Sequence, residues 1–387
     1  MAETKASTGM ADTEIGKITS IRPSFLEIDL AAFDHNFGLV KAAAGPAAKI
    51  MAIVKANAYG HGLVPIAQRA QERGADFLGV ALIEEGERLS AAGIKIPIVV
   101  LYPDAVERAR RLVQAGLVAT VSSIEHMQGL NAAAISGNAP VQVFLKVETG
   151  MGRYGASMPE MRQILAASRQ MKAISILGIS TNLADSSNGD DAFTRQQFDQ
   201  FMKAVSELDP WRRVSYYSIE NSSGLLYHHR DSFNLVRVGL ALYGICPRKD
   251  PLDSLKPALS LKSRIIQIKK WPAKKPVGYG GTFVPKRVSV LATIGLGYGD
   301  GYPWSLSNKA QVLINGQRAP IAGRVCMDAI IIDVTDVAGV KTGDEVVLVG
   351  RSGNDEISIL ELAELAGSFA YELLSGFSDR LPRIYRE

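Results

Sequence analysis

Between residues 49 and 238, short apolar runs rich in β-branched residues alternate with segments whose apolar positions recur at helical spacing. The helical segments include residues 63–73, 105–115, 158–171 and 194–208. The apolar runs predict eight strands, at residues 49–54, 77–81, 97–101, 118–122, 141–147, 174–180, 214–219 and 234–238. Eight strand–helix units favour an α/β fold, a parallel (β/α)8 barrel of the TIM type. An open doubly wound sheet has the same alternation and is the alternative.

The pattern changes after residue 258. Short strand-like runs are separated by turn signals such as Asn315-Gly316 and Gly323. We predict a mostly antiparallel β domain with strands at 263–269, 287–294, 310–314, 329–334 and 345–349 and one closing helix at 359–369. The expected organisation is a flexible tail over 1–20, a barrel domain over 21–258 and a β domain over 259–387, with the boundary in segment 249–257.

Composition narrows the functional classes. The chain has 387 residues and is 47% apolar, which excludes a largely disordered protein. Lys and Arg number 43 against 39 Asp and Glu, and no basic run occurs, so we expect no nucleic-acid partner. Cys246 and Cys326 are too few for a disulfide framework and are expected as reduced thiols. The polar first 20 residues and the lack of an 18-residue apolar run predict a cytoplasmic protein without a membrane span.

The ends of the predicted barrel strands carry the first candidate chemistry, because the carboxyl ends of barrel strands meet at the active site. Lys55 follows the first strand and precedes Tyr59, Gly60 and Gly62. Burial lowers the pKa of an amine, which then forms Schiff bases with carbonyl compounds or pyridoxal phosphate. A lysine that simply extends to solvent is the alternative. The glycine-rich turn favours the first interpretation, because glycine lets a ligand approach the backbone.

A candidate phosphate site lies after the seventh and eighth strands, where barrels often bind phosphate. Asn221 and Ser222 follow the seventh strand, and Gly239 and Leu240 follow the eighth, which contains Arg237. Two ordinary Gly/Ser loops are the alternative. After the fifth strand, Arg153 lies in a glycine-flanked loop and suits a carboxylate or a phenolate, unless it is a solvated surface arginine.

Glycine-bracketed tyrosines mark the second domain. Tyr279 and Tyr298 lack bulky neighbours and are better explained as presented side chains, and a tyrosine near cations can act as an acid or base. Cys326 has no nearby histidine in its motif, which favours a plain thiol over a nucleophile. The five histidines lack metal-ligand spacing, so we expect no metal site.

Six motifs together resemble the alanine racemase family, enzymes of fold type III that depend on pyridoxal phosphate. In chain order they are VKANAYGHG, ETGMGRYG, VRVGLALYG, GYGGT, GYGDG and GRVCMD, and the resemblance spans about residues 22–385. It implies a barrel plus a β domain and a homodimer whose active sites are shared between subunits. It also implies interconversion of L- and D-alanine, which supplies D-alanine for peptidoglycan.

The resemblance assigns roles residue by residue. Lys55 would carry the cofactor and act as one base, and Tyr279 of the other subunit would be the opposite base. Arg237 would face the pyridine nitrogen. Arg153 would bind the cofactor's phenolic oxygen and, with the Met327 N–H, the substrate carboxylate. Tyr298 would line the access path. The expected phosphate ligands are Tyr59, Asn221, Ser222, Gly239, Leu240 and Tyr243, and the expected supporting residues are Lys146, Asn182 and Asp328.

The chain also departs from the family pattern. Asn182 and Ser218 stand where histidines are usual, and Glu148 replaces a more usual aspartate. Asn182 can hydrogen-bond but cannot titrate, so we hypothesise an active enzyme with an altered tyrosine pKa. Lys146 is often carbamylated in relatives, which would make it an anion that steadies Arg153.

Three other functions remain open from the sequence. The first is a racemase of serine or another small amino acid, because serine differs from alanine by one hydroxyl, which a small pocket rejects poorly. A non-catalytic protein that binds pyridoxal phosphate generally lacks the second domain. A decarboxylase of this fold type has an acidic partner for the pyridine nitrogen, where this chain has Arg237.

Overall fold

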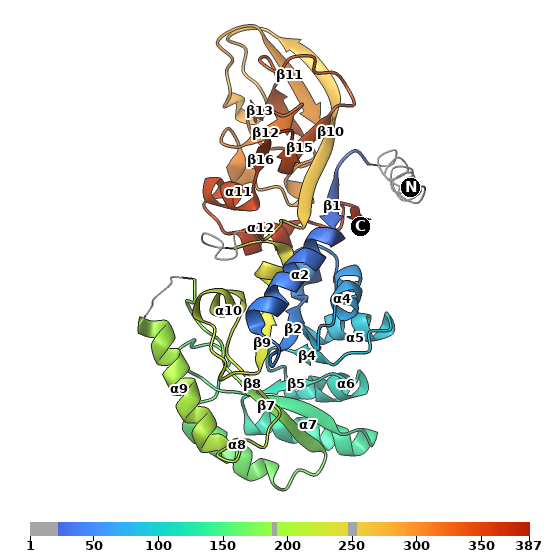
Figure 1. The fold of residues 1–387 in the computed structure, drawn as a ribbon. Coiled ribbons are helices and arrows are strands. Elements are labelled where there is room, and N and C mark those ends of the chain that lie inside the picture. Colours follow the sequence, from blue (N-terminus) through green and yellow to red (C-terminus); the bar gives the residue numbers. More distant parts are fainter. Residues whose placement is uncertain (1–21, 188–191, 247–253) are drawn as a thin grey trace, which may run out of the picture. The chain divides into compact units, whose positions relative to one another are not determined.

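The computed structural model describes residues 22–187, 192–246 and 254–387. The tail expected over 1–20 and most of the expected boundary segment lie outside these residues. The chain divides into two units (Figure 1). The barrel unit comprises Ala32–Ala58 and Gly62–Lys256, and the sheet unit comprises Tyr59–His61, Pro257–Glu387 and the described part of Met1–Ala31.

All eight predicted strands of the barrel unit are present. They are β2 (Lys49–Ile53), β3 (Phe77–Val80), β4 (Ile98–Val100), β5 (Ala119–Val121), β6 (Val141–Lys146), β7 (Ile174–Ser180), β8 (Tyr216–Ser218) and β9 (Leu235–Val238). They form two parallel sheets, β4-β3-β2-β9 and β5-β6-β7-β8. A parallel bridge between Val99 and Val118 joins β4 to β5, and the Arg237 N–H donates to the Glu220 carbonyl at 3.0 Å beside β8 and β9. The ring of strands therefore closes, which confirms the barrel over the open sheet.

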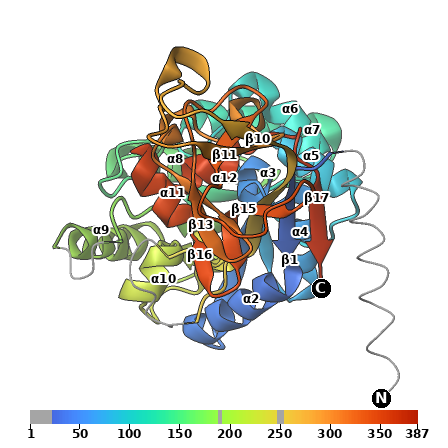
Figure 2. The ribbon, with the colours of Figure 1, turned by 90° about the horizontal axis from the view of Figure 1, so that it is seen from above.

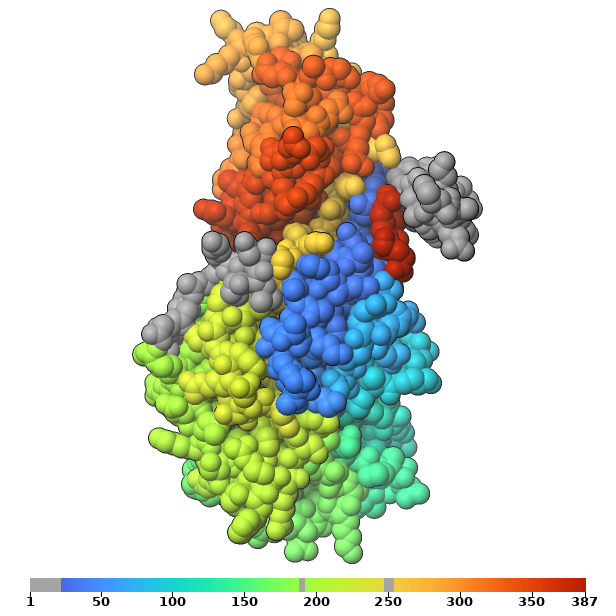
Figure 3. All heavy atoms as spheres, in the orientation of Figure 1, coloured from blue at the N-terminus to red at the C-terminus, as the bar shows by residue number. Residues whose placement is uncertain are grey.

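Helices follow the barrel strands where helical spacing predicted them. In α4 (Leu63–Glu72), the buried residues Leu63, Ile66, Ala67 and Ala70 share one face of the helix, as expected for a helix that packs on strands. On the face drawn in Figure 3, the surface of α2 lies in dark blue between light blue and yellow-green residues. The helices of the unit are α2 (Leu30–Ala44), α3 (Lys55–Tyr59), α4, α5 (Ile83–Ala91), η1 (Val106–Arg108), α6 (Ala109–Gln114), α7 (Ile124–Gly137), α8 (Met158–Ser168), α9 (Ala192–Leu208), α10 (Ser222–His228) and η2 (Leu240–Tyr243).

The sheet unit is mostly antiparallel, as predicted. Its nine-stranded sheet has the order β13-β12-β15-β10-β1-β17, with β11, β14 and β16 attached beside this path. The pairing of β1 with β17 is parallel (Figure 2). The strands are β1 (Phe25–Asp29), β10 (Leu259–Trp271), β11 (Ser289–Ile294), β12 (Gln311–Ile314), β13 (Gln317–Pro320), β14 (Ile330–Asp333), β15 (Glu345–Ser352), β16 (Asp355–Ile357) and β17 (Arg383–Arg386).

Strand β1 differs from the domain boundaries expected from the sequence, which placed it with the barrel. It pairs with β10 and β17 instead, for example through Leu26 opposite Leu261. Both of its edges find hydrogen-bond partners in the C-terminal part of the chain, and Leu26 and Ile28 are fully buried there. The sheet unit is therefore built from both ends of the sequence.

The end of the sheet unit also differs from the single closing helix that we expected. Helix α11 (Ile359–Ala366) stops at Gly367, whose φ of 67° gives the left-handed cap that ends many helices. A second helix, α12 (Ala370–Gly376), follows it. Three short turns, η3 (Tyr279–Gly281), η4 (Tyr298–Asp300) and η5 (Trp304–Leu306), complete the unit.

Candidate active site

The turn after β2 has an unusual backbone. In α3, the φ angles of Ala56, Asn57, Ala58 and Tyr59 are 52°, 55°, 53° and 51°, so the turn is left-handed. Each non-glycine residue in this conformation costs about 1–2 kcal/mol. Four in succession persist only where surrounding contacts fix them, and such strained segments concentrate at functional sites. Lys55 is the residue that enters this turn.

Lys55 lies in a cluster of cations and tyrosine rings within the barrel unit. Its side chain is half-buried, between the buried amine and the solvent-extended lysine that the sequence left open. The Lys55 amine donates a hydrogen bond to the Tyr102 hydroxyl at 2.6 Å. The exposed Arg153 guanidinium lies 5.3 Å from the Tyr102 ring centre and 5.4 Å from that of Tyr154. Tyr102 therefore links Lys55, after β2, to Arg153, after β6.

Arg237 on β9 is buried and held by uncharged acceptors. It donates to Ser218 Oγ at 2.6 Å, to the Thr181 carbonyl at 2.8 Å, to Asn182 Oδ1 at 3.2 Å and to the Ile219 carbonyl at 3.3 Å. Burial lowers the pKa of Arg237 to about 10, so the group remains a cation at neutral pH. Asn182 and Ser218, the two departures from the family pattern, are thus direct partners of Arg237.

Lys146 at the end of β6 lies beside the same cation. Burial, followed by the charges of Arg237 and Arg153, holds the pKa of Lys146 well below its ordinary range. The amine donates to the Thr181 carbonyl at 3.4 Å. It lines a cavity of about 10 Å³ together with Arg237, Ser218 and Ser180, among others.

The candidate phosphate loops are joined by Ser222. Its Oγ accepts from the Gly239 N–H at 3.0 Å and from the Ala241 N–H at 3.3 Å, so the loop after β9 is tied to the start of α10. Leu240 is buried in this loop. Asn221 caps α10, because its Oδ1 accepts from the Gly224 N–H at 2.9 Å.

Tyr243 does not suit the phosphate role that we expected for it. The residue is completely buried, and its hydroxyl donates to the Ile53 carbonyl at 2.8 Å. Its ring packs against Phe33 at 6.2 Å between centres. Tyr243 is therefore a core residue that ties η2 to β2, and we remove it from the candidate site.

Tyr59 belongs to the sheet unit by its contacts. Its ring lies 5.7 Å from that of Tyr371, between centres. The residue is buried.

The glycine-bracketed tyrosines of the sheet unit are presented to solvent. Tyr279 is 72% exposed, and Tyr298 is 44% exposed. The glycines on either side of Tyr279 have φ angles of 68° and 71°, which L-residues rarely adopt. The turn therefore presents most of the Tyr279 side chain to solvent.

Two loops that hold Tyr298 and Met327 are bonded to each other. The Tyr298 N–H donates to the Cys326 carbonyl at 3.0 Å, and the Gly299 N–H donates to the Met327 carbonyl at 2.9 Å. A side chain at Gly297 would lie 2.2 Å from the Cys326 carbonyl oxygen, so only glycine fits this approach. Met327 is half-exposed.

An ionic cluster supports these two loops. The fully buried Asp300 accepts from Arg22 at 2.5 Å and from the Gly297 N–H at 3.0 Å. Arg380 lies 3.3 Å from Asp300 and 2.5 Å from Asp328, so it links the carboxylates that follow Tyr298 and Met327.

The two cysteines are free thiols. Burial raises the pKa of Cys326, which keeps the thiol protonated and disfavours the nucleophile alternative. In the described parts of the chain, no group of three or more His, Cys, Asp or Glu side chains could hold a metal ion.

The barrel residues fit an anionic cofactor that carries an aldehyde and a phosphate. Lys55 supplies an amine, and Arg153 and Arg237 supply positive charge near Lys146. The loop after β9 and the start of α10, which Ser222 joins, carry a hydroxyl and backbone N–H groups. This set of donors suits pyridoxal phosphate.

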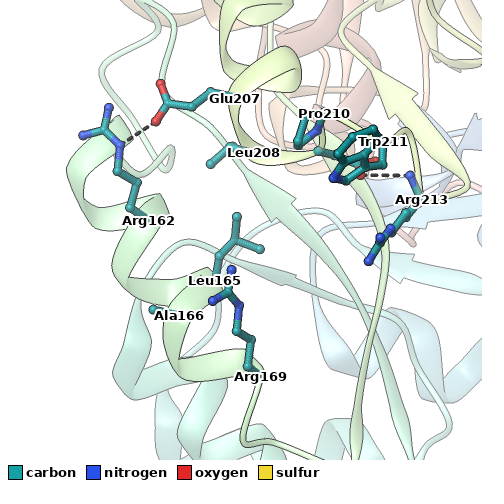
Figure 4. A pocket seen from close by; sticks show the side chains of 10 residues that line it. Arg162, Leu165, Ala166, Arg169, Glu207, Leu208, Pro210, Trp211 and Arg213 are labelled. Carbon is teal, nitrogen blue, oxygen red and sulfur yellow. Dashed lines mark hydrogen bonds and ion pairs between the residues drawn. The ribbon is translucent and has the colours of Figure 1, made fainter.

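A larger pocket lies elsewhere on the barrel unit, between α8, α9 and the loop before β8 (Figure 4). Its volume is about 460 Å³, and its lining includes Arg162, Glu207 and Trp211. Arg162 and Glu207 form an ion pair at 2.5 Å. None of the residues expected from the sequence lines this pocket, so it is not the candidate site.

Sequence reasoning missed three residues of the site region, namely Tyr102, Glu85 and Asp300. Tyr102 directly follows the Leu101 end of a predicted strand, a position that could have identified it. Asp300 lies inside the quoted motif GYGDG. Glu85 resembles an ordinary acidic residue in the first turn of a helix, and no local signal separates it from its neighbour Glu84.

Comparison with known proteins gives matches along nearly the whole chain. Residues 28–247 match the family model described as "Alanine racemase, N-terminal domain", and residues 258–385 match "Alanine racemase, C-terminal domain". An alanine racemase of Halothermothrix orenii is 40% identical over 94% of this chain and 97% of its own length. One from Symbiobacterium thermophilum is 38% identical over 95% of this chain and 98% of its own length.

Solved structures give the same result. An alanine racemase from Bacillus anthracis, with bound L-Ala-P, superimposes with a TM-score of 0.89 at 32% identity and covers 95% of both chains. An alanine racemase from Clostridium difficile has a TM-score of 0.89 at 30% identity and covers 94% of this chain and 96% of that one.

Proposed function

Because this chain belongs to the alanine racemase family of isomerases, we propose that it interconverts L-alanine and D-alanine with two bases and bound pyridoxal phosphate. The observation that carries the proposal is the Lys55–Tyr102–Arg153 cluster beside Arg237 and Lys146, which supplies an amine and a cationic environment. In this proposal, the D-alanine that the enzyme makes is used for peptidoglycan.

Pyridoxal phosphate, when bound, withdraws electrons from the substrate α-carbon and makes its proton acidic. Lys55 would hold the cofactor through its amine. Ser222, Gly239, Leu240, Asn221 and Tyr59 would surround its phosphate. Arg237 would face the pyridine nitrogen as a cation at neutral pH. It would not give a proton to that nitrogen, so the bound ring would withdraw electrons less strongly than a protonated ring.

Racemisation needs a proton to leave one face of the α-carbon and a proton to arrive at the other. We assign Lys55 to one face. Tyr279 of the partner subunit would serve the opposite face, and the exposure of Tyr279 on its glycine turn supports this role. Arg153 and the Met327 N–H would orient the substrate carboxylate. Tyr298 would restrict the side-chain size of the substrate.

A homodimer is part of this proposal. Large hydrophobic side chains are exposed on the sheet unit, among them Tyr279, Trp304 and Phe369, as expected for a surface that another subunit covers. No helix in the described part of the chain combines the length and apolar character that crossing a bilayer requires. A cytoplasmic location stays a prediction.

The test is to purify the protein, record its visible absorbance, and treat it with borohydride. We expect a band that borohydride removes in the parent and that Lys55→Ala lacks. L-Alanine is then followed by polarimetry, with L-serine in parallel. Absence of the band would refute the cofactor. A band with rotation of L-alanine unchanged would refute alanine as substrate, and loss of rotation with L-serine alone would identify a serine racemase.

A further inference from the structure

Glu85 is a buried carboxylate that binds the backbone beside Lys55. It lies in the first turn of α5 and is 9% exposed. Its Oε1 accepts from the Ala56 N–H at 2.6 Å, and its Oε2 accepts from the Ala81 N–H at 2.8 Å and the Leu82 N–H at 3.1 Å. The three donors are backbone groups that follow β2 and β3, so one carboxylate joins the ends of two adjacent strands.

The Ala56 N–H belongs to the peptide plane between Lys55 and the left-handed turn. Ala56 is the first of the four residues with positive φ. A hydrogen bond to this plane fixes the backbone on the carboxyl side of Lys55, and with it the direction in which the Lys55 side chain leaves the strand. That direction brings the Lys55 amine to the Tyr102 hydroxyl.

The far end of the turn is fixed independently of Glu85. Asn57 Oδ1 accepts from the Leu63 N–H at 2.8 Å, and the Asn57 carbonyl accepts from the Gly62 N–H at 2.9 Å. These bonds hold the turn against α4. At the start of the turn, the Ala58 N–H donates to the Val54 carbonyl at 2.8 Å, and Glu85 adds the bond to the Ala56 N–H directly after Lys55.

A carboxylate suits this task better than an amide. The three N–H donors lie at both terminal atoms of the Glu85 side chain, so both atoms must be acceptors. An ionised carboxylate has two acceptor oxygens. A glutamine has one acceptor oxygen, and its NH₂ group would face at least one backbone N–H. Charge-assisted hydrogen bonds of this kind are also stronger than neutral ones.

We propose that Glu85 is the positioning residue for Lys55, because its carboxylate fixes the peptide plane that follows the lysine. The inference rests on the proposed cofactor role of Lys55. It assigns Glu85 no contact with substrate or cofactor. Its effect would pass through the backbone of the left-handed turn.

The matched variants are Glu85→Gln and Glu84→Gln. Glu84 is the neighbouring residue on α5, and its partially exposed carboxylate pairs with Arg108 and Arg111. We expect Glu85→Gln to bind pyridoxal phosphate at least about tenfold more weakly, measured by the band that borohydride removes. In the cofactor-saturated enzyme we expect a lower kcat with little change in KM. Glu84→Gln should match the parent in both measurements.

A second measurement does not depend on the cofactor. Hydrogen–deuterium exchange of the cofactor-free protein should be faster in the peptide that spans residues 54–63 in Glu85→Gln, and unchanged there in Glu84→Gln. Urea unfolding of both variants separates this local effect from global loss of stability. If Glu85→Ala does not fold, Glu85→Gln still gives the answer.

The outcomes separate this inference from the proposed function. A parent protein without the band refutes the cofactor role of Lys55, and faster exchange in Glu85→Gln would then still support the backbone role of Glu85. A parent with the band, combined with variants that are alike in cofactor affinity and exchange, overturns the inference. Reduced global stability with unchanged cofactor affinity and kcat also overturns it.

Discussion

Four neutral acceptors hold the buried guanidinium of Arg237, and Ser218 makes the shortest of these contacts at 2.6 Å. Ser218→Ala would leave a buried donor of a charged group without this partner, at a cost of about 1–3 kcal/mol. We expect kcat to fall about tenfold, since Arg237 would lose its fixed orientation. Steady-state kinetics check this, with Ser175→Ala as the control at an exposed position on β7. Equal kinetics of the two variants would contradict an orienting role for Ser218.

Asn182 gives a prediction about pH. Its Oδ1 accepts from Arg237 at 3.2 Å, and its Nδ2 donates to the Leu183 carbonyl at 2.9 Å. An amide does not titrate, whereas a histidine with an ordinary pKa of about 6.5 changes charge within the working range. We therefore expect the pH–rate profile of Asn182→His to gain an inflection or to shift. A profile identical to that of the parent would refute the hypothesis that Asn182 sets the pH dependence of this enzyme.

Tyr102 is a further test of the cluster around Lys55. Tyr102→Phe removes the hydroxyl that accepts from the Lys55 amine and keeps the ring beneath Arg153. We expect a reduction in kcat of about two- to tenfold, equivalent to one neutral hydrogen bond. Tyr102→Ala also removes the cation–π contact and should reduce kcat further. The contact is irrelevant to catalysis if both variants match the parent.

Site residues with a local signal in the sequence could be predicted. Residues whose role depends on contacts with distant parts of the chain could not. Lys55 was predicted because a lysine at the end of an apolar strand is unusual, whereas the role of Arg237 was predicted from the resemblance to the family. Glu85 has the sequence context of many surface acids, because the burial of its carboxylate depends on a turn 29 positions earlier in the chain. Tyr243 failed in the opposite way, since its motif suggested a ligand contact and its hydroxyl serves the core.

At the scale of elements, Asp209 organises the connection between α9 and β8. Its carboxylate accepts from the Tyr217 hydroxyl at 2.5 Å, the Arg213 N–H at 2.8 Å and the Val214 N–H at 3.0 Å. Burial raises the pKa of Asp209, but these hydrogen bonds outweigh burial and lower it overall. Burial and the bond to Asp209 raise the pKa of Tyr217 to about 12.

The sign of the pH dependence follows from these directions. A depressed aspartate pKa stabilises the fold above the unfolded-state value of about 3.9, and this stability is lost as pH falls through the folded-state pKa. The raised tyrosine pKa gives stability that is present below about pH 10 and is lost as pH rises toward 12. We expect Asp209→Asn to lower the free energy of unfolding by about 1–3 kcal/mol at pH 7, with a smaller difference at pH 3. Urea unfolding across pH measures this, with Asp199→Asn on α9 as the exposed control.

The elements themselves were predicted with uneven success, for a physical reason. The eight barrel strands are mostly buried apolar runs whose pattern does not depend on which strands they pair with. Strand β1 has an equally clear pattern, but its partners come from the other end of the chain, and local sequence carries no information about that pairing. The left-handed α3 was not predicted, because Ala and Tyr ordinarily avoid positive φ, and contacts such as those of Glu85 and Asn57 stabilise this turn.

On the scale of the whole molecule, the proposed bases lie in different units, Lys55 in the barrel unit and Tyr279 in the sheet unit. If each active site combines Lys55 of one subunit with Tyr279 of the other, two inactive variants can complement each other. Lys55→Ala and Tyr279→Phe homodimers should each be nearly inactive. In a mixed dimer, one site would have both wild-type bases and the other would have neither.

Equal amounts of the two variants should therefore regain activity when their subunits exchange. Random exchange makes about half of the dimers mixed, and one of the two sites in each mixed dimer is complete, so the expected activity is about one quarter of the parent's. Polarimetry of L-alanine before and after exchange measures the gain, with each variant exchanged against itself as the control. Sites built within single chains would give no gain, because every chain in the mixture lacks one base. A measured quarter would thus assign Tyr279 to the partner subunit's active site, and a mixture that stays inactive despite demonstrated exchange would refute the shared site.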